Sequence, residues 1–192
     1  MYVARQAFDR AEQELHAGAT AQDAQQGSHA FTSVGSHWLL GLVRLARGDE
    51  QGALDAFQRE LTFEATGQLY GRECAANTWY AIGAVLLRQG RRAEAAGAFE
   101  HALDRVPGHL LAMIGLSTVQ DPSPEREEVH QNIARRIGQL AAAGLVVDAA
   151  TGRAALMAAT GAGDDAAPLL DEALSAAAGG GGGRTIPFDP LL

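Results

Sequence analysis

The stretch from Asn77 to Pro107 constrains the fold most, because it has the pattern of two antiparallel amphipathic helices joined by a tight turn. Large apolar residues recur at helical spacing up to Gly90, which breaks the pattern. A second run of small and apolar residues then follows and ends at Pro107. Small residues stand where the two helices must approach closely, Gly83 on the first and Ala95 on the second. The stretch therefore predicts a closely packed helical hairpin.

These residues resemble a tetratricopeptide repeat, a helical hairpin of about 34 residues with preferred residue types at fixed offsets. The eight positions of that pattern are occupied by Trp79, Ile82, Gly83, Leu86, Ala95, Phe99, Ala102 and Pro107, with Ile and Leu as mild departures. The resemblance implies stacked helical hairpins that present a surface to protein partners and carry out no chemistry of their own.

A second copy of the pattern lies between Ser36 and Leu61, and it aligns with the first without gaps. The matched pairs are Gly41 with Gly83, Gly48 with Gly90, Ala53 with Ala95, and Phe57 with Phe99. The offset, from position 41 to position 83, is 42 residues and so exceeds the usual repeat length. Glu60 departs from the pattern, because it stands where a small residue is expected. We predict clear repeats at about 36–66 and 76–107.

The flanking segments are helical in pattern but divergent. Residues 2–16 are spaced like the second helix of a repeat whose first helix is missing. Residues 17–36 form a polar linker, in which 20–26 is compatible with a helical turn or two. Two interpretations of this start stay open: the chain is a fragment of a longer protein, or the segment is an N-terminal cap of the kind that repeat stacks need. A partial third repeat begins at 108, and a helical part spans 123–178. The predicted fold class is all-α, a short right-handed α-solenoid of repeat-like hairpins, as a single domain over 1–178.

Capping signals divide the C-terminal helical part into separate helices. Ser123 is expected to cap a helix that has Pro124 at its first position, and Gly144 is expected to end it. Asp148 is expected to cap the helix that follows and continues to Ala159.

Composition disfavours several function classes. The net charge is −8, whereas nucleic-acid and anionic-membrane binding use cationic surfaces. The single Cys74 has no partner for an intramolecular disulfide, which favours a reducing compartment. No apolar signal segment or membrane-spanning run is present. All basic residues are arginine, which suggests a GC-rich bacterial genome. We expect a soluble, bacterial, cytoplasmic protein.

Residues that could support catalysis are few. The sequence has no phosphate-binding loop, zinc-protease motif, CxxC pair or nucleophile elbow. None of the six histidines lies three or four residues from another. Cys74 falls on an apolar stripe and is expected to be packed and inert, and the histidines are expected to be surface or interhelical residues. We predict no enzyme activity, no catalytic residue, no metal site and no cofactor.

The resemblance also assigns a concave groove to the first helix of each hairpin. Carried over position by position, its lining residues are Trp38, Leu42, Leu45, Asn77, Tyr80, Ala84, Leu87 and Arg88. The groove is apolar and aromatic with polar margins, and it lacks the Lys/Asn carboxylate clamp of the chaperone-binding members. Such a surface suits an apolar helix or an extended apolar segment.

The last residues form a glycine linker and an apolar tail, 179–192. After five glycines, the tail carries four large apolar residues that two prolines separate, and we expect it to dock; they are Ile186, Phe188, Leu191 and Leu192. The predicted function is a non-catalytic protein–protein interaction module or scaffold. Its groove binds a protein or peptide partner, and the tail is the first candidate, either in cis or as a link in a homodimer. The alternative is an accessory or regulatory portion of a larger enzyme or signalling protein.

Overall fold

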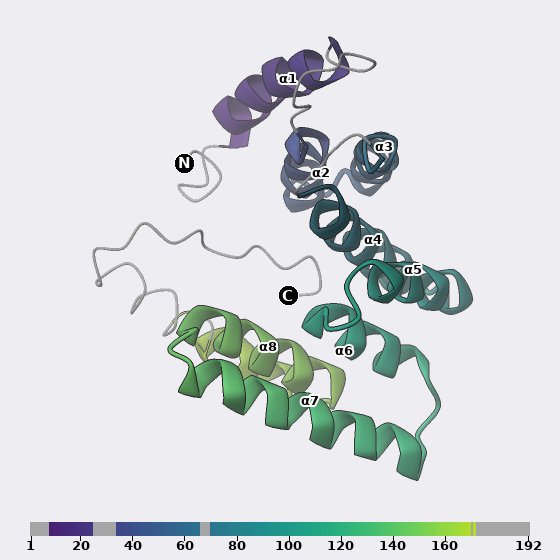
Figure 1. Ribbon diagram of the computed structural model, residues 1–192, viewed down its shortest axis with the longest axis vertical. Coiled ribbons are helices and arrows are strands. Elements are labelled where there is room, and N and C mark those ends of the chain that lie inside the picture. The colour runs from purple at the N-terminus through teal and green to yellow at the C-terminus, as the bar shows by residue number, and fades with distance from the viewer. Residues whose placement is uncertain (1–7, 25–33, 66–69, 170, 172–192) are drawn as a thin grey trace. The chain divides into compact units, whose positions relative to one another are not determined.

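The computed structural model describes residues 8–24, 34–65, 70–169 and 171. The chain divides into two compact units, Met1–Pro107 and Gly108–Leu192 (Figure 1). All regular structure in the described residues is helical, which confirms the all-α prediction. Whether 1–178 behaves as one domain stays a prediction. None of the helices in the described residues is both long and apolar enough to cross a membrane.

The first unit is a series of helices in which neighbours in sequence pack on one another. They are α1 (Phe8–Ala24), α2 (Ser36–Ala46), α3 (Glu50–Leu61), α4 (Gly71–Arg88) and α5 (Arg92–Arg105). Helices α2 and α3 form one hairpin and α4 and α5 the next (Figure 1). Both turns contain a glycine with positive φ, Gly48 at 82° and Gly90 at 75°, a conformation that L side chains rarely adopt.

The two hairpins share one packing contact. In each, a glycine of the first helix lies against the ring of a phenylalanine on the second, Gly41 against Phe57 and Gly83 against Phe99. Both rings are fully buried. The gap-free alignment of these pairs in the sequence therefore corresponds to a repeated geometry in the structure.

Helix α1 differs from the expected division into a helix and a polar linker. The sequence pattern ended the first helix at residue 16 and allowed a separate helical turn or two over 20–26, but α1 is one continuous helix to Ala24 through Gly18. Its last turns make tertiary contacts: Gln22 is completely buried, and Asp23 pairs with residues of α2 and α3. These contacts outweigh the low helix propensity of Gly18 and explain why the helix does not stop earlier.

The second unit consists of α6 (Leu110–Val119), α7 (Pro124–Ala142), α8 (Val146–Ala159) and the short 3-10 helix η3 (Gly163–Asp165). Its core includes Ile114, Ile133 and Ile137. The Ser123 hydroxyl accepts a hydrogen bond from the backbone N–H of Arg126 at 3.1 Å, as predicted for a cap.

The two boundary predictions that follow α7 had opposite outcomes. Gly144, with φ of 78°, lies two residues beyond the end of α7 and confirms the predicted stop. The predicted cap at Asp148 is wrong, because α8 already begins at Val146 and Asp148 lies in its first turn. An acidic residue is favourable at either place, since both are close to the positive end of the helix dipole.

His109 caps α6 in the neutral state. Its Nδ1 accepts a hydrogen bond from the backbone N–H of Ala112 at 3.1 Å. Burial disfavours the imidazolium and lowers the pKa of His109 to about 4. Protonation of this side chain therefore opposes folding of the second unit.

We predict that replacing His109 by Asn flattens the pH dependence of stability between pH 6.5 and 4. The folded-state pKa lies below the ordinary value, so the neutral cap's contribution is complete above about pH 6.5 and is lost as the pH falls toward 4. In that interval the free energy of unfolding of the wild type should fall by about 2–3 kcal/mol more than that of the variant. The variant's amide oxygen still caps the helix and does not titrate. Urea unfolding at pH 7 and pH 4.5, followed by circular dichroism, measures the difference. Parallel pH profiles for the two proteins would contradict it.

Candidate functional site

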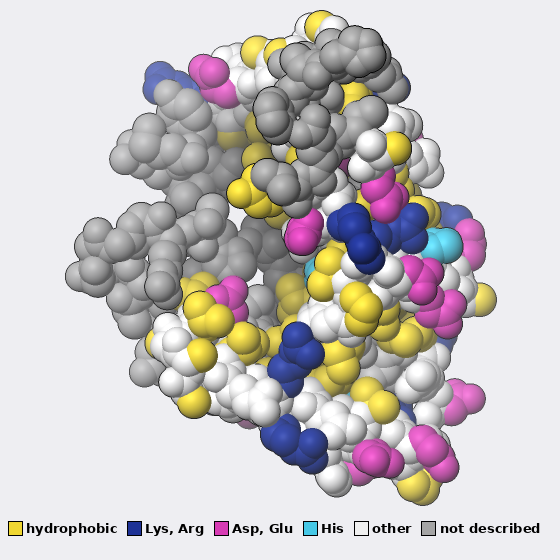
Figure 2. Space-filling view, in the orientation of Figure 1, with side chains coloured by type: hydrophobic (Ala, Val, Ile, Leu, Met, Phe, Trp, Pro, Cys, Tyr) yellow, Lys and Arg dark blue, Asp and Glu magenta, His cyan; other side chains and the backbone are white. Residues whose placement is uncertain are grey.

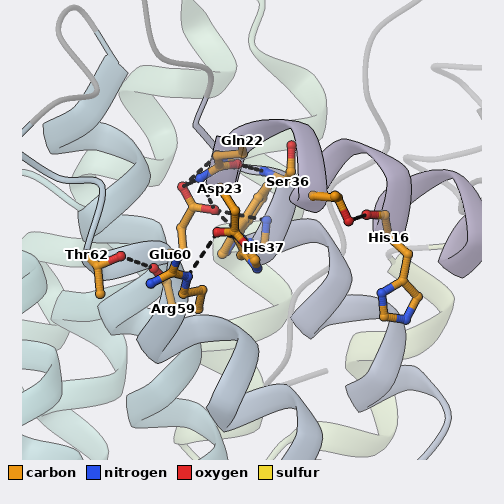
Figure 3. Close-up of polar contacts among 11 residues, drawn as sticks. His16, Gln22, Asp23, Ser36, His37, Arg59, Glu60 and Thr62 are labelled. Carbon is orange, nitrogen blue, oxygen red and sulfur yellow. Dashed lines mark hydrogen bonds and ion pairs between the residues drawn. The ribbon is translucent and has the colours of Figure 1, made fainter. Parts of the chain in front are cut away.

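A polar network joins the N-terminus of α2 to α1 and α3. The Glu60 carboxylate, at the end of α3, accepts hydrogen bonds from the backbone N–H groups of Gly35, His37 and Trp38 at 2.7, 3.0 and 3.2 Å. The Gln22 amide donates to the same carboxylate at 3.2 Å, and its oxygen accepts from the backbone N–H of Ser36 (Figure 3). Glu60 is 3% exposed, so this charge is stabilised by the donors and by the helix dipole.

Beside this network, Asp23 bridges a histidine and an arginine. Its Oδ1 lies 3.0 Å from Nε2 of His37 and accepts a hydrogen bond from Nε of Arg59 at 2.9 Å (Figure 3). Partial burial acts to raise the pKa of Asp23, but the hydrogen bonds from His37 and Arg59 outweigh it and lower the pKa overall. The His37 ring also stacks on Phe63 at 5.8 Å between centroids. The cluster thus adds polar contacts between α1 and the α2–α3 hairpin.

Each described histidine makes contacts within the fold that explain its position without a catalytic or metal-binding role. His130 Nε2 lies 3.0 Å from the Ser117 hydroxyl, but that hydroxyl donates to the Ile114 carbonyl at 2.7 Å. Its proton is therefore not shared with His130, and Ser117 is 1% exposed, so the pair is not an activated nucleophile. His101 lies against the Trp79 ring at 4.6 Å. The described part of the chain contains no His, Cys, Asp and Glu cluster that could hold a metal ion.

Cys74 is a packed thiol, in agreement with the sequence. Burial raises its pKa, and the nearby Glu60 carboxylate, which accepts from Sγ at 3.5 Å, raises it further. A thiol in this setting is a poor nucleophile, because the thiolate is the reactive form.

The eight predicted groove residues fall into two groups. Leu42, Leu45, Tyr80 and Ala84 are buried, at 5% exposure or less. Trp38, Asn77 and Leu87 are half-buried, and the exposed Arg88 pairs with Glu50 of α3 at 3.1 Å. The four tail residues lie outside the described part of the chain. The assignment of the groove as a binding site stays a prediction, but its accessible portion is narrower than the sequence suggested.

Two of the accessible groove residues line one hollow in the first unit. Trp38 and Asn77 face a space of about 360 Å³ between the beginnings of α2 and α4. The other lining residues are Val34, Gly35, Ser36, Leu39, Tyr70, Glu73 and Cys74. Sequence reasoning missed the two most exposed apolar members, Leu39 at 38% and Tyr70 at 71%. Tyr70 precedes α4 and lies outside the repeat pattern, which explains why the pattern could not assign it.

The hollow has a mixed chemical character. The indole N–H of Trp38 is buried without a hydrogen-bond partner among the described residues, although a buried indole usually has one. Among the described residues that line it, Glu73 is the only acidic one. On the face shown in Figure 2, acidic and basic side chains are interspersed and do not form areas of one sign. The described lining of the hollow therefore combines aromatic and aliphatic surface with one acidic side chain.

A family model for the tetratricopeptide repeat matches residues 76–109. The match covers α4 from Ala76 onward and all of α5, and it agrees with the repeat that the sequence predicted at 76–107. No curated protein and no solved structure matches the chain.

Proposed function

Because residues 76–109 form a tetratricopeptide repeat, a motif of protein–protein interaction modules that is usually non-catalytic, we propose that the hollow between α2 and α4 is where this protein binds its partner. The partner is an extended apolar segment with an exposed backbone. The observation that carries the proposal is the hollow itself: two positions that the repeat pattern assigns to the groove, Trp38 and Asn77, line it together with the exposed Tyr70.

The size and chemistry of the hollow favour a short peptide. At about 360 Å³ it is at the low end for ligand sites, so it suits a few apolar side chains better than a whole helix. Tyr70 and Leu39 at the rim would cover the apolar side chains of the peptide.

The chain's own tail is the first candidate for this segment. It carries Ile186, Phe188, Leu191 and Leu192 within seven residues, with Pro187 and Pro190 restricting the backbone. Prolines lower the entropy that an extended peptide loses on binding. A tail that docks in cis would close the hollow, and one that docks in a second copy would link a dimer. The low cysteine content favours a cytoplasmic setting for this interaction.

We predict that a peptide with the sequence of residues 184–192 changes the fluorescence of Trp38. The recipient is the full chain with its four apolar tail residues replaced by Ser, which leaves the hollow free, and with Trp79→Phe, so that Trp38 is the only indole. Binding should shift the emission with a Kd on the order of 10–100 μM, as is usual for short peptides in shallow sites. A peptide with Ser at the four apolar positions is the control.

Tyr70 separates binding in the hollow from binding elsewhere. Its side chain is 71% exposed, so Tyr70→Ser should leave stability unchanged while it weakens peptide binding about fivefold or more. Light scattering of the unmodified chain then distinguishes a tail bound in cis from one bound in a second copy. Absence of any Trp38 response, or equal affinity for the Tyr70→Ser variant, would contradict the proposed site.

A further inference from the structure

Helix α1 is attached to the first unit with little apolar burial. Among the described residues, its only buried apolar side chains are Ala11 and Ala19, and the third buried residue is the polar Gln22. Phe8 and Leu15 are only half-buried. By comparison, α2 buries Leu40, Leu42, Val43 and Leu45. Since burial of apolar surface is the main source of docking energy, α1 is held far less strongly than the helices beneath it.

Charge compensates for this deficit. Three arginines and one histidine, on α2, at its C-cap and on α3, face α1, and we call them the basic face: His37, Arg44, Arg47 and Arg59. Arg47 lies 2.6 Å from Asp9 and 3.0 Å from Glu12. Glu12 also lies 3.8 Å from Arg44. Farther along α1, Asp23 contacts the remaining two members of the basic face (Figure 3). Three carboxylates of α1 thus lie against the three arginines and the histidine of the basic face.

The fit between α1 and the basic face is incomplete. A hollow of about 250 Å³ remains between α1, α2 and α3, and its lining includes Ala19, Leu40 and Ala56. Most of the ion pairs are also partly exposed: the Asp9 side chain is 85% exposed, and those of Arg47, Asp23 and Arg59 are 40–42% exposed. Exposed pairs of this kind are individually weak and are screened by salt. A better-filling helix with the same charges would therefore displace α1.

We infer that the basic face is a second docking surface, separate from the hollow between α2 and α4, and that its ligand is an acidic amphipathic helix of a partner protein. Helix α1 is the resident occupant and competes with the partner. The charge complementarity defines the partner's chemistry. Its helix carries carboxylates at the spacing found in α1, and between them it carries apolar side chains that fill the space that α1 leaves open. A rise in ionic strength weakens both occupants.

The wild-type chain provides the first test. Hydrogen exchange should be about tenfold faster for the amides of 8–24 than for those of α2, and raising NaCl from about 20 mM to about 300 mM should accelerate α1 selectively. Equal protection of α1 and α2 at both salt concentrations would overturn the inference, because α1 would then not be exchangeable.

The second test measures binding in trans. The recipient is the full chain with Asp9→Asn, Glu12→Gln and Asp23→Asn, which loosens α1, and the probe is a fluorescent peptide with the sequence of residues 8–24. The peptide should bind this variant about tenfold more tightly than the wild type, and less tightly at higher salt. Glu14→Gln is the matched control, because Glu14 is an exposed α1 carboxylate without an ion pair among the described residues.

The outcomes separate the alternatives. The inference would be overturned if the triple variant and the wild type bound the 8–24 peptide with equal affinity while hydrogen exchange of residues 8–24 was fast in the variant. The basic face would then be free of α1 and still not bind the added helix. The inference would also be overturned if a neutralised peptide, with Asn, Gln and Asn at positions 9, 12 and 23, bound as tightly as the acidic peptide. Dimerisation of the variant through exchange of α1, seen by light scattering, would overturn the choice of a foreign partner. None of these results bears on the peptide response of Trp38, so this inference and the proposed function can fail independently.

Discussion

Replacing Gly83 by Ala should destabilise the first unit by about 2–3 kcal/mol, because the added methyl group has no space. A Cβ at this position would lie 2.5 Å from Cε1 and 2.7 Å from Cδ1 of Phe99. The Phe99 ring is fully buried and so has little freedom to move. Either α4 and α5 move apart, or the ring leaves its preferred rotamer. Urea denaturation monitored by circular dichroism gives the free energy of unfolding.

Gly97 provides the matched control on the partner helix of the same hairpin. A Cβ at Gly97 meets nothing within 4 Å, and the residue does not have a positive φ. Gly97→Ala should therefore stabilise the protein by up to about 1 kcal/mol, through the higher helix propensity of Ala. The same chemical change thus has opposite effects on α4 and α5, which excludes a general effect of the methyl group.

A double-mutant cycle assigns the destabilisation to one contact. Phe99→Leu removes the ring edge, so the combination with Gly83→Ala should be more stable than the sum of the single effects by about 1 kcal/mol or more. Strict additivity, or a Gly83→Ala variant as stable as the wild type, would show that the hairpin does not depend on this contact. Gly41→Ala should behave in the same way through Phe57 in the first hairpin.

The hairpins were predictable because their signals are local. Gly41 and Phe57, like Gly83 and Phe99, lie within one hairpin, and their spacing survives in the sequence as a gap-free alignment. Residues that cap or break helices, such as Ser123 and Gly144, also act on their own chain neighbours. The all-α fold and the repeat at 76–109 could accordingly be identified from the sequence.

The contacts of α1 could not be predicted, since they join residues that are distant in sequence. Gln22 and Glu60 are 38 positions apart; Gln22 lies outside the repeat pattern, and Glu60 departs from it. The sequence showed only that Glu60 replaces an expected small residue. Likewise Tyr70, the most exposed apolar residue of the hollow, follows no periodicity that would connect it with Trp38. Such sites depend on which helices pack together, and helix periodicity does not determine that.

Glu60 gives the second large effect, because its carboxylate serves several donors at once. Glu60→Ala should destabilise the first unit by about 3–5 kcal/mol, as for the loss of a buried charged partner. The backbone N–H groups of Gly35, His37 and Trp38 would lose their acceptor, and so would the NH2 group of the fully buried Gln22. Hydrogen exchange at the first turn of α2 should increase in parallel with the loss measured by urea denaturation.

The second hairpin makes this experiment decisive. It has Ala102 where the first has Glu60, so a position that only required a small residue would accept Glu60→Ala without loss. An alanine variant as stable as the wild type would therefore show that the hydrogen bonds to Glu60 do not contribute to stability. Glu60→Gln keeps one oxygen acceptor but loses the charge. Its free energy of unfolding should lie between those of the alanine variant and the wild type, about 1–3 kcal/mol below the wild type. Glu64→Gln is the control for a carboxylate in a partly exposed ion pair, 3.0 Å from Arg105, and should cost at most about 1 kcal/mol.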